Sequence, residues 1–311
     1  MKIIPCTMNN VKNASDMAVD KGLCTEVAEI VDAVVSDQGR ADIRPGFIEV
    51  VSLTAGHSVY GYQGSLLFVD SGTLKRRMIP SGTVVVVSTL SCNDPMDYAE
   101  TPVGLFCTNG TDALLLVNGV VTPIPVKETA VVSGVEVPTY NVAPPAGRFC
   151  CWWKGMLWIL AFEDGQSFLY NTTGYGLGID SRANYNRFPG NPNMLRAVDD
   201  GLYLSAGNKT MLAKWGAVAG ARTLVMAQEV YSSAIPGTAV VREAEKMNVK
   251  GSGKVCYWRG SNGESDSCFM GTNQGFTNLS EDIIRMSKGQ TGAAMIRNTD
   301  NKFHYIAVAT A

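Results

Sequence analysis

The sequence predicts an all-β fold, a single-domain β-propeller of six or seven four-stranded antiparallel blades. Three observations favour this class: a regular spacing of turn glycines, short strands on both sides of each turn, and strands that are apolar at every position. Gly64, Gly110, Gly155 and Gly201 lie 46, 45 and 46 residues apart. Propeller blades repeat every roughly 40 to 50 residues. The 311 residues divided by 46 give 6.8, so six blades with an N-terminal arm, or seven blades, both fit.

The repeated unit is predicted to be an antiparallel meander. Four segments share a strand, a tight turn at one of these glycines and a second strand: 59–69, 105–117, 149–160 and 194–204. Each segment is followed by a second turn dipeptide that contains glycine: Ser71-Gly72, Asn118-Gly119, Asp164-Gly165 and Gly207-Asn208. Such dipeptides supply the positive φ angles that tight hairpin turns require. We therefore expect strand, turn, strand, turn, strand in each unit.

The strands of the unit are predicted to be covered on both faces. Residues 150–153 and 156–160 are apolar at odd and even positions alike. A strand with one solvated face instead alternates apolar and polar residues. Radial stacking of small sheets around an axis covers both faces of each sheet. Two looser copies of the unit follow at 254–271 and 292–308. The alternative is a generic β-rich domain with glycine turns.

The N-terminal part of the chain departs from the repeat. Residues 1–50 are predicted to form an N-terminal arm, strands that close the ring or a first blade, and residues 51–311 the propeller. Val31–Val35 and Phe47–Val51 are strand-like runs within the first part. A helix over Ser15–Val35 stays open as an alternative, because periodicity alone does not distinguish a short apolar helix segment from a strand.

Charge and hydropathy argue against nucleic acid and membranes as partners of the chain. The chain carries 26 basic and 28 acidic residues, a net charge of −2, so we expect no strong binding of nucleic acid or anionic lipid. Its most apolar stretch, 149–162, is interrupted by Lys154 and is shorter than the roughly 20 residues that span a bilayer. Pro5 interrupts the first residues too early for the apolar region of a signal peptide. We expect synthesis in the cytoplasm and no membrane insertion.

Residue types that carry chemistry are few. None of the eight cysteines forms a Cys-x-x-Cys pair, and His57 and His304 are the two histidines, so zinc-ligand spacing is missing and reduced, mostly buried thiols are expected. A Ser-His or Cys-His nucleophile needs a nearby histidine, and both histidines are expected to be structural. Glu163-Asp164 and Asp199-Asp200 precede turn glycines, where Asp is favoured by turn geometry. We therefore expect no catalytic residue, no cofactor and no metal.

Loop residues are the candidate binding site. Trp152, Trp153 and Trp158 are expected in the core, because bulky aromatics in doubly covered strands usually pack there. The segment 171–193 is rich in Gly, Asn and aromatic residues, and is predicted to be a long connection; such connections usually bind or pack against something. Its candidate binding residues are Tyr175, Arg182, Tyr185 and Arg187.

Several segments of the chain resemble the propeller-forming virion proteins of tailed bacteriophages, which are tail hub, nozzle and DNA-stabilisation proteins. The resemblance lies in turn and strand residues across most of 39–308: 39–46, 55–60, 66–74, 185–189, 194–204 and 271–276. It implies a non-enzymatic structural protein of the virion tail, a hub or adaptor that docks other tail proteins and forms a homo-oligomer in a symmetric assembly. The chain is shorter than the larger family members and lacks their insertions.

Two alternatives to this role remain open. The first is a receptor- or carbohydrate-binding propeller at the tail tip, which would hold a host surface glycan with its aromatic residues and the 171–193 segment. The second is an enzyme such as a glycosidase or lyase, which would use a carboxylate pair.

Overall fold

The computed structural model describes residues 33–35, 41–43, 52–124, 127–133, 135–140, 145–172, 177–178, 185–218, 221–247, 253–280, 288–299 and 302–310. Regular structure in these residues consists of β-strands and one 3-10 helix, Glu245–Met247. Within the same residues no helix has the length and apolar character needed to cross a membrane.

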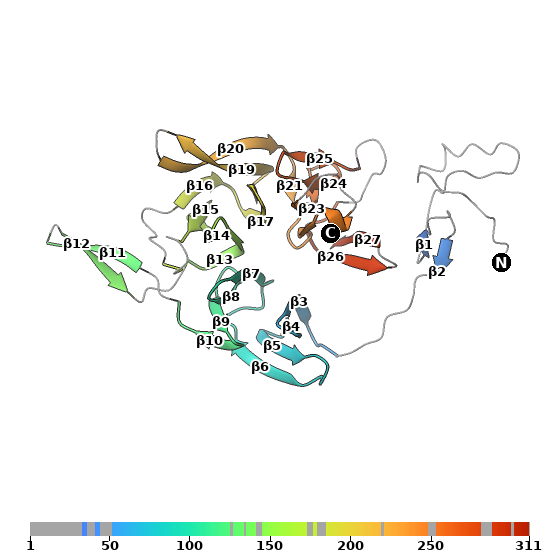
Figure 1. The fold of residues 1–311 in the computed structure, drawn as a ribbon, viewed down its shortest axis with the longest axis horizontal. Helices are drawn as coiled ribbons and strands as arrows, with labels where there is room; N and C mark the ends of the chain where they lie inside the picture. Colours follow the sequence, from blue (N-terminus) through green and yellow to red (C-terminus); the bar gives the residue numbers. More distant parts are fainter. Residues whose placement is uncertain are drawn as a thin grey trace, which may run out of the picture.

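Two four-stranded antiparallel sheets come first along the main body of the chain (Figure 1). Sheet 1 has the order β3 (Gly56–Tyr62), β4 (Ser65–Asp70), β5 (Thr73–Met78) and β6 (Val84–Thr89). Sheet 2 consists of β7 (Asp97–Thr101), β8 (Gly104–Thr108), β9 (Ala113–Val117) and β10 (Val120–Thr122). Both sheets are meanders in which each strand pairs with the next one in sequence.

Two further sheets continue the same pattern, and a third departs from it at its first two strands. Sheet 3 has β13 (Gly147–Trp153), β14 (Met156–Glu163), β15 (Gln166–Asn171) and β16 (Tyr185–Pro189). Sheet 4 has β17 (Pro192–Val198), β18 (Gly201–Ala206), β19 (Lys209–Val218) and β20 (Ala221–Val230). In sheet 5, β21 (Ser233–Ala234) and β22 (Val240–Glu243) both pair with β23 (Lys254–Ser261), which is followed by β24 (Asp266–Gly271) and β25 (Phe276–Asn278).

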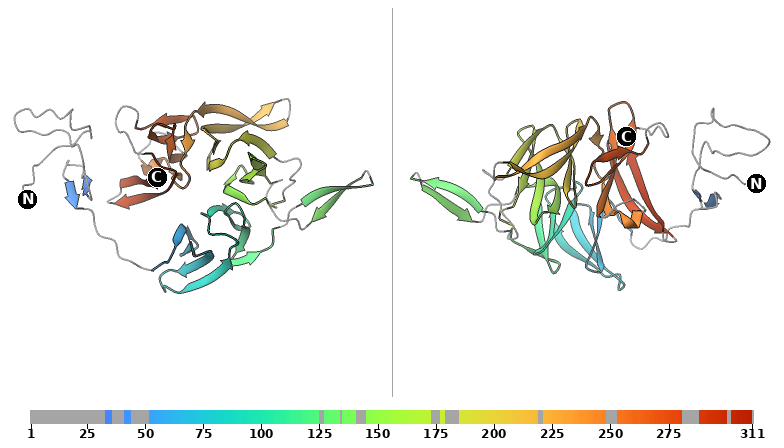
Figure 2. Two further views of the ribbon diagram at one scale, coloured as in Figure 1. Left: turned by 180° about the vertical axis from the view of Figure 1, so that it is seen from behind. Right: turned by 45° about the horizontal axis from the view of Figure 1, so that its top comes forward.

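Three two-stranded hairpins complete the described strands. The first is β1 (Ala33–Val35) with β2 (Ala41–Ile43), and the second is β11 (Lys127–Val132) with β12 (Val135–Tyr140). The third is β26 (Thr291–Thr299) with β27 (Lys302–Thr310). The β11–β12 hairpin projects away from the ring, whereas β26–β27 takes a place in the ring between sheet 5 and sheet 1 (Figure 1 and Figure 2).

The sheets are arranged around a centre, with the first strand of sheets 1 to 4 and β22 of sheet 5 innermost (Figure 1). Strand β7 lies beside β13, β13 beside β17, β17 beside β22, and β22 beside β26. Strand β3 joins this series through stacked rings of Tyr60 and Tyr98, whose centroids are 4.8 Å apart. This arrangement confirms the predicted β-propeller, with six positions around the ring. Among the described strands, the sixth position holds the β26–β27 hairpin alone.

The second repeat unit has the predicted order of strand, turn, strand, turn and strand, but it begins one strand later in its sheet than the other three units do. Gly110 lies in the turn between β8 and β9, not between the first two strands of its sheet, and Asn118-Gly119 joins β9 to β10. The turn that joins β7 to β8 contains Pro102 and Val103 instead. Asn-Gly favours a tight turn between any two antiparallel strands. Its recurrence marks a turn without identifying the strands that the turn connects.

The core lies between neighbouring sheets. Trp153 and Trp158 are almost fully buried, and their rings pack against each other and against Trp215 at centroid distances of 5.7 to 6.2 Å. This cluster joins sheets 3 and 4, together with Leu160 and Leu204. The core position predicted for Trp153 and Trp158 is confirmed, and Trp152 is half-buried against the sheet 2 side of the same sheet.

The described cysteines are free thiols, and four of them are buried: Cys107, Cys150, Cys151 and Cys256. Burial raises the pKa of the Cys256 thiol to about 12, so it stays protonated at neutral pH. Four of the six described cysteines are thus buried, in agreement with the prediction of mostly buried thiols. Cys6 and Cys24 lie outside the described residues. The predicted boundary at residue 50 lies there as well, and it stays a prediction.

Candidate functional site

An ion pair lies on the inner strands of the ring. The Arg196 guanidinium of β17 donates to both carboxylate oxygens of Asp97 on β7, with Nη1–Oδ2 and Nη2–Oδ1 distances of 2.7 and 2.9 Å. The two side chains are 21% and 13% exposed. Asp97 Oδ2 also accepts the backbone N–H of Cys150 at 2.9 Å, and Arg196 Nε donates to the Ala239 carbonyl at 3.4 Å. One pair thus connects sheets 2, 3, 4 and 5.

The Asp97–Arg196 ion pair holds its two side chains at a fixed distance and orientation. Burial works against the charge on Arg196, but the Asp97 carboxylate outweighs burial and raises the pKa of Arg196 above its usual value. A bidentate arginine–carboxylate contact fixes both orientation and distance. We therefore assign the Asp97–Arg196 pair to the alignment of the inner strands.

A second polar contact on the inner strands joins sheets 1 and 2. The Tyr60 hydroxyl donates to Glu100 Oε1 at 3.0 Å, and the Tyr98 hydroxyl donates to the Ser58 carbonyl at 2.7 Å. Burial and the Glu100 carboxylate raise the pKa of Tyr60 above its usual value. Both phenols therefore act as hydrogen-bond donors that hold β3 against β7.

The predicted binding residues fall into two groups. Tyr175 and Arg182 lie outside the described residues. Tyr185 and Arg187 lie together on β16, where Arg187 Nη2 donates to the Tyr185 hydroxyl at 3.2 Å. The Arg187 guanidinium carbon is 5.3 Å from the ring centroids of both Tyr185 and Phe168. The structure thus brings these two residues together on the outermost strand of sheet 3.

The predicted long connection over 171–193 requires a correction. Residues 185–189 form β16 and pair with β15, and β17 already begins at Pro192. Asn186 and Arg187 are polar, so the sequence lacks the apolar pattern that identifies a strand here. The outer strand of a blade is exposed and tolerates polar residues on one face.

An exposed row of valines runs along the outer edge of sheets 1 and 2. We call it the valine edge; it comprises Val84, Val85 and Val86 on β6 and Val120 and Val121 on β10, with exposed fractions of 42%, 44%, 65%, 67% and 38%. Strands β6 and β10 are the last strands of their sheets and lie beside each other. Successive residues of a strand point to opposite faces, so β6 presents valines on both faces of an edge strand.

A cavity of about 470 Å³ opens between the end of sheet 4 and the outer part of sheet 5. Its lining is uncharged and combines aromatic rings, amides and hydroxyls: Val230, Tyr231, Ser232, Asn262, Ser267, Phe269, Phe276, Thr277 and Asn278. Ser232 is 3% exposed, and its Oγ has no hydrogen-bond partner among the described residues. Small-molecule sites typically measure about 300 to 1,000 Å³, so this cavity has room for a ligand of one or two sugar rings.

Neither the valine edge nor the cavity was predicted as a site. The run Val84–Val87 is visible in the sequence as four consecutive valines, but the same pattern also fits a doubly covered strand. Only the end position of β6 in its sheet exposes these residues. The cavity gives no local signal, because its lining comes from three separate segments.

His57 and Asp199, one histidine and one member of a carboxylate pair, bond to neighbouring segments. The His57 ring bonds to Ser58 Oγ at 2.8 Å and Asn93 Oδ1 at 3.2 Å. Asp199 lies in the β17–β18 turn and accepts the backbone N–H of Lys254 at 2.7 Å, which fastens sheet 4 to sheet 5. In the part of the chain that the structure describes, no three His, Cys, Asp or Glu residues gather as a metal-binding group.

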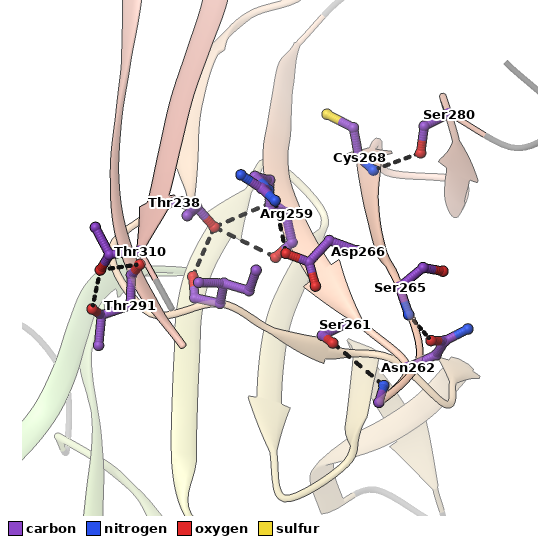
Figure 3. A network of polar contacts seen from close by, with 12 residues as sticks. Thr238, Arg259, Ser261, Asn262, Ser265, Asp266, Cys268, Ser280, Thr291 and Thr310 are labelled. Atoms are coloured by element: carbon purple, nitrogen blue, oxygen red, sulfur yellow. Dashed lines mark hydrogen bonds and ion pairs between the residues drawn. The ribbon is translucent and has the colours of Figure 1, made fainter. Parts of the chain in front are cut away.

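A network of polar contacts covers the other side of sheet 5 (Figure 3). Arg259 Nη2 donates to Asp266 Oδ2 at 2.7 Å, and both residues are buried. The Thr238 hydroxyl accepts the Arg259 backbone N–H at 3.1 Å and donates to the Ile235 carbonyl at 2.7 Å. Thr238 also accepts the Tyr305 hydroxyl of β27 through its backbone carbonyl, so this network adjoins the β26–β27 hairpin.

Comparisons with known proteins return similarity in structure alone. No protein-family model matches the chain, and no curated protein matches it. The N-terminal domain of Nup159 is similar with 9% sequence identity and a TM-score of 0.46, over 82% of this chain and 73% of that one. A protein from Lactobacillus plantarum is similar with 8% identity and a TM-score of 0.38, over 82% and 74%. The tricorn protease is similar with 9% identity and a TM-score of 0.25, over 84% of this chain and 24% of that one.

Proposed function

We propose that this chain is a non-enzymatic structural protein of a bacteriophage virion, in which the propeller docks other tail proteins as a hub or adaptor. The valine edge is the observation that carries the docking role. Its five valines are each at least 38% exposed, and contiguous exposed apolar surface on a soluble protein typically marks a protein interface.

Strand β6 has the chemistry of a docking strand. Among the described strands it pairs only with β5, so one row of its backbone N–H and C=O groups faces outward. An exposed apolar edge strand invites pairing with an extended segment of another chain. Proteins usually protect such an edge with lysine, proline or a bulge. Strand β6 has a bulge at Val87, which the register with β5 leaves out, but its segment Val84–Val86 contains neither lysine nor proline.

The assignment to a phage tail rests on the sequence resemblance. Two of the segments that carry it, 66–74 and 194–204, form β4 with the start of β5 and the β17–β18 hairpin, which belong to the ring itself. A rigid ring that is present in several copies in a symmetric particle gains affinity through multivalency. We therefore propose a location in the virion tail, a homo-oligomeric arrangement and other tail proteins as partners.

Co-sedimentation with isolated tails of the phage that encodes the chain tests this function. The purified wild-type chain is expected to sediment with tails, and the double variant Val84→Lys/Val86→Lys to lose binding by about tenfold or more, because charge on an apolar interface must be desolvated. Val225→Lys is the matched control, since Val225 is 42% exposed on the outer strand of sheet 4. Failure of the wild type to sediment with tails, or equal loss in the lysine variants at both places, would contradict the proposal.

The cavity favours glycan binding as a second candidate function. Its aromatic rings offer stacking surfaces, and its amides and hydroxyls match the hydroxyls of a neutral sugar. Tyr231 is 64% exposed at the rim, with Lys209 Nζ 4.4 Å from its ring centroid.

Titration of host surface oligosaccharides by ligand-observed NMR tests the second candidate. Tyr231→Ala is expected to weaken binding by about tenfold, the loss typical of one stacking contact. Arg187→Ala on β16 should leave binding unchanged if the cavity holds the glycan. Loss of binding in Arg187→Ala alone would move the site to β16, and absence of binding by the wild type would exclude this function for the sugars tested.

A further inference from the structure

The β26–β27 hairpin occupies the first two strand positions of an incomplete sixth sheet. The innermost strands of the other sheets form a continuous series in which each lies beside the next, and β26 extends it by lying beside β22. Strand β27 lies beside β23, the second strand of sheet 5. The hairpin therefore matches positions one and two, and positions three and four, beyond β27, hold no strand among the described residues.

The β26–β27 hairpin packs against sheet 5 and is bonded to it. The Tyr305 hydroxyl donates to the Thr238 carbonyl at 2.7 Å, and the Tyr305 and Tyr257 rings stack at 5.5 Å. The Gly292 N–H donates to the Pro236 carbonyl at 2.9 Å. Figure 3 shows Thr291 and Thr310 at the end of this hairpin, close to Thr238. One face of the hairpin is thus fixed against sheet 5.

The remaining surfaces of the hairpin are open. Met295, Ile306 and Val308 point away from sheet 5 and are 54%, 38% and 63% exposed. The outer edge of β27, which is nine residues long, pairs with no described strand. A long apolar edge of this kind is normally covered or paired in a soluble protein.

The geometry points to the β1–β2 hairpin as the occupant: β1 adds to the free edge of β27, and β2 adds to β1, which gives a four-stranded sheet in the order β26-β27-β1-β2. Strands β1 and β2 are antiparallel to each other, as positions three and four of every other sheet are. In the structure they pair with no other described strand, and they lie on the side of the ring where β26–β27 sits (Figure 1, Figure 2).

Chain direction agrees with this order. In sheets 1 and 3 the chain leaves the outermost strand and enters the innermost strand of the next sheet, from β6 to β7 and from β16 to β17, and from sheet 2 it reaches β13 through the β11–β12 hairpin. With β2 outermost in the sixth sheet, the chain would pass to β3 in the same way. Twelve residues separate Ile43 from Gly56, and they span up to roughly 40 Å when extended. The end of this linker is anchored, since Asp70 Oδ1 accepts the Thr54 and Ala55 N–H groups, each at 3.0 Å.

Cysteine cross-linking in the full chain, at low concentration and without tails, tests this closure apart from the tail function. Val34→Cys in β1 is combined in turn with one cysteine at each position from Phe303 to Val308, and disulfides are mapped by peptide mass spectrometry after mild oxidation. Side chains alternate between faces along a strand, and a disulfide needs Cα atoms within about 7 Å. Intramolecular disulfides are therefore expected at alternate positions of β27 only. No disulfide with any position, or disulfides only between two chains, would overturn the proposal, the latter in favour of strand exchange between copies.

Hydrogen exchange gives a second measurement that does not depend on new cysteines. Val34→Pro removes a backbone donor from β1 and is expected to raise exchange of the β27 amides by about tenfold or more, because they lose a pairing strand. Val131→Pro in the β11–β12 hairpin is the matched control, and it should leave β27 exchange unchanged. Equal β27 exchange in the wild type and Val34→Pro would overturn the closure.

Discussion

At the residue scale, the Asp97–Arg196 pair connects four of the sheets around the ring, sheets 2 to 5. Asp97→Ala removes the carboxylate and leaves the largely buried Arg196 charge without its partner. Loss of one member of a buried pair costs about 3 to 5 kcal/mol, and the partial exposure of this pair reduces that to about 2 to 4 kcal/mol. Denaturant unfolding followed by circular dichroism should show this loss as a lower midpoint with an unchanged slope.

The Lys154–Asp200 pair provides the control for that measurement. Its Nζ–Oδ1 distance is also 2.7 Å, but the two side chains are 39% and 65% exposed. Solvent screens such a pair, so Asp200→Ala is expected to cost no more than about 1 kcal/mol. Equal losses in the two alanine variants would show that Asp97 and Arg196 do not align the inner strands.

At the element scale, the sequence predicted the central strand β14, which is covered on both faces, and missed the outer strand β16. Strand β14 is apolar at both parities, and its residues from Leu157 to Ala161 are buried. Such a strand can be identified without knowing its neighbours, because burial on both faces leaves no polar positions. The outer strand β16 contains Asn186 and Arg187, and it was therefore mistaken for a loop.

Exposure of an element depends on its place in the sheet, which local sequence does not encode. The valines of β6 and the apolar residues of β14 look alike in the sequence, yet β6 is an edge strand and β14 is central. Tyr185 and Arg187 were predicted as binding residues because they lie in a segment rich in Gly, Asn and aromatic residues. The Asp97–Arg196 pair was not, since its members are 99 residues apart and meet only when the ring forms.

At the scale of the whole molecule, sheets 2 and 3 contact each other directly, without the β11–β12 hairpin between them. The Gly110 N–H donates to the Gly147 carbonyl at 2.9 Å, and the Thr108 hydroxyl donates to the same oxygen. These contacts join the end of β8 directly to the start of β13, while β11–β12 projects outward (Figure 2). The hairpin is thus an insertion between two sheets that already touch.

Replacement of residues 125–144 by about ten Gly and Ser residues should therefore leave the ring intact. A flexible linker of this length changes loop-closure entropy by less than about 1 kcal/mol, so the denaturation midpoint is expected to stay close to that of the wild type, in contrast to Asp97→Ala. Loss of cooperative unfolding would mean that the hairpin holds sheets 2 and 3 together.

The same variant also distinguishes between two candidate docking elements, the valine edge and the β11–β12 hairpin. Retained co-sedimentation with tails agrees with docking through the valine edge, whereas loss of it with an unchanged midpoint would place the docking surface on the hairpin instead.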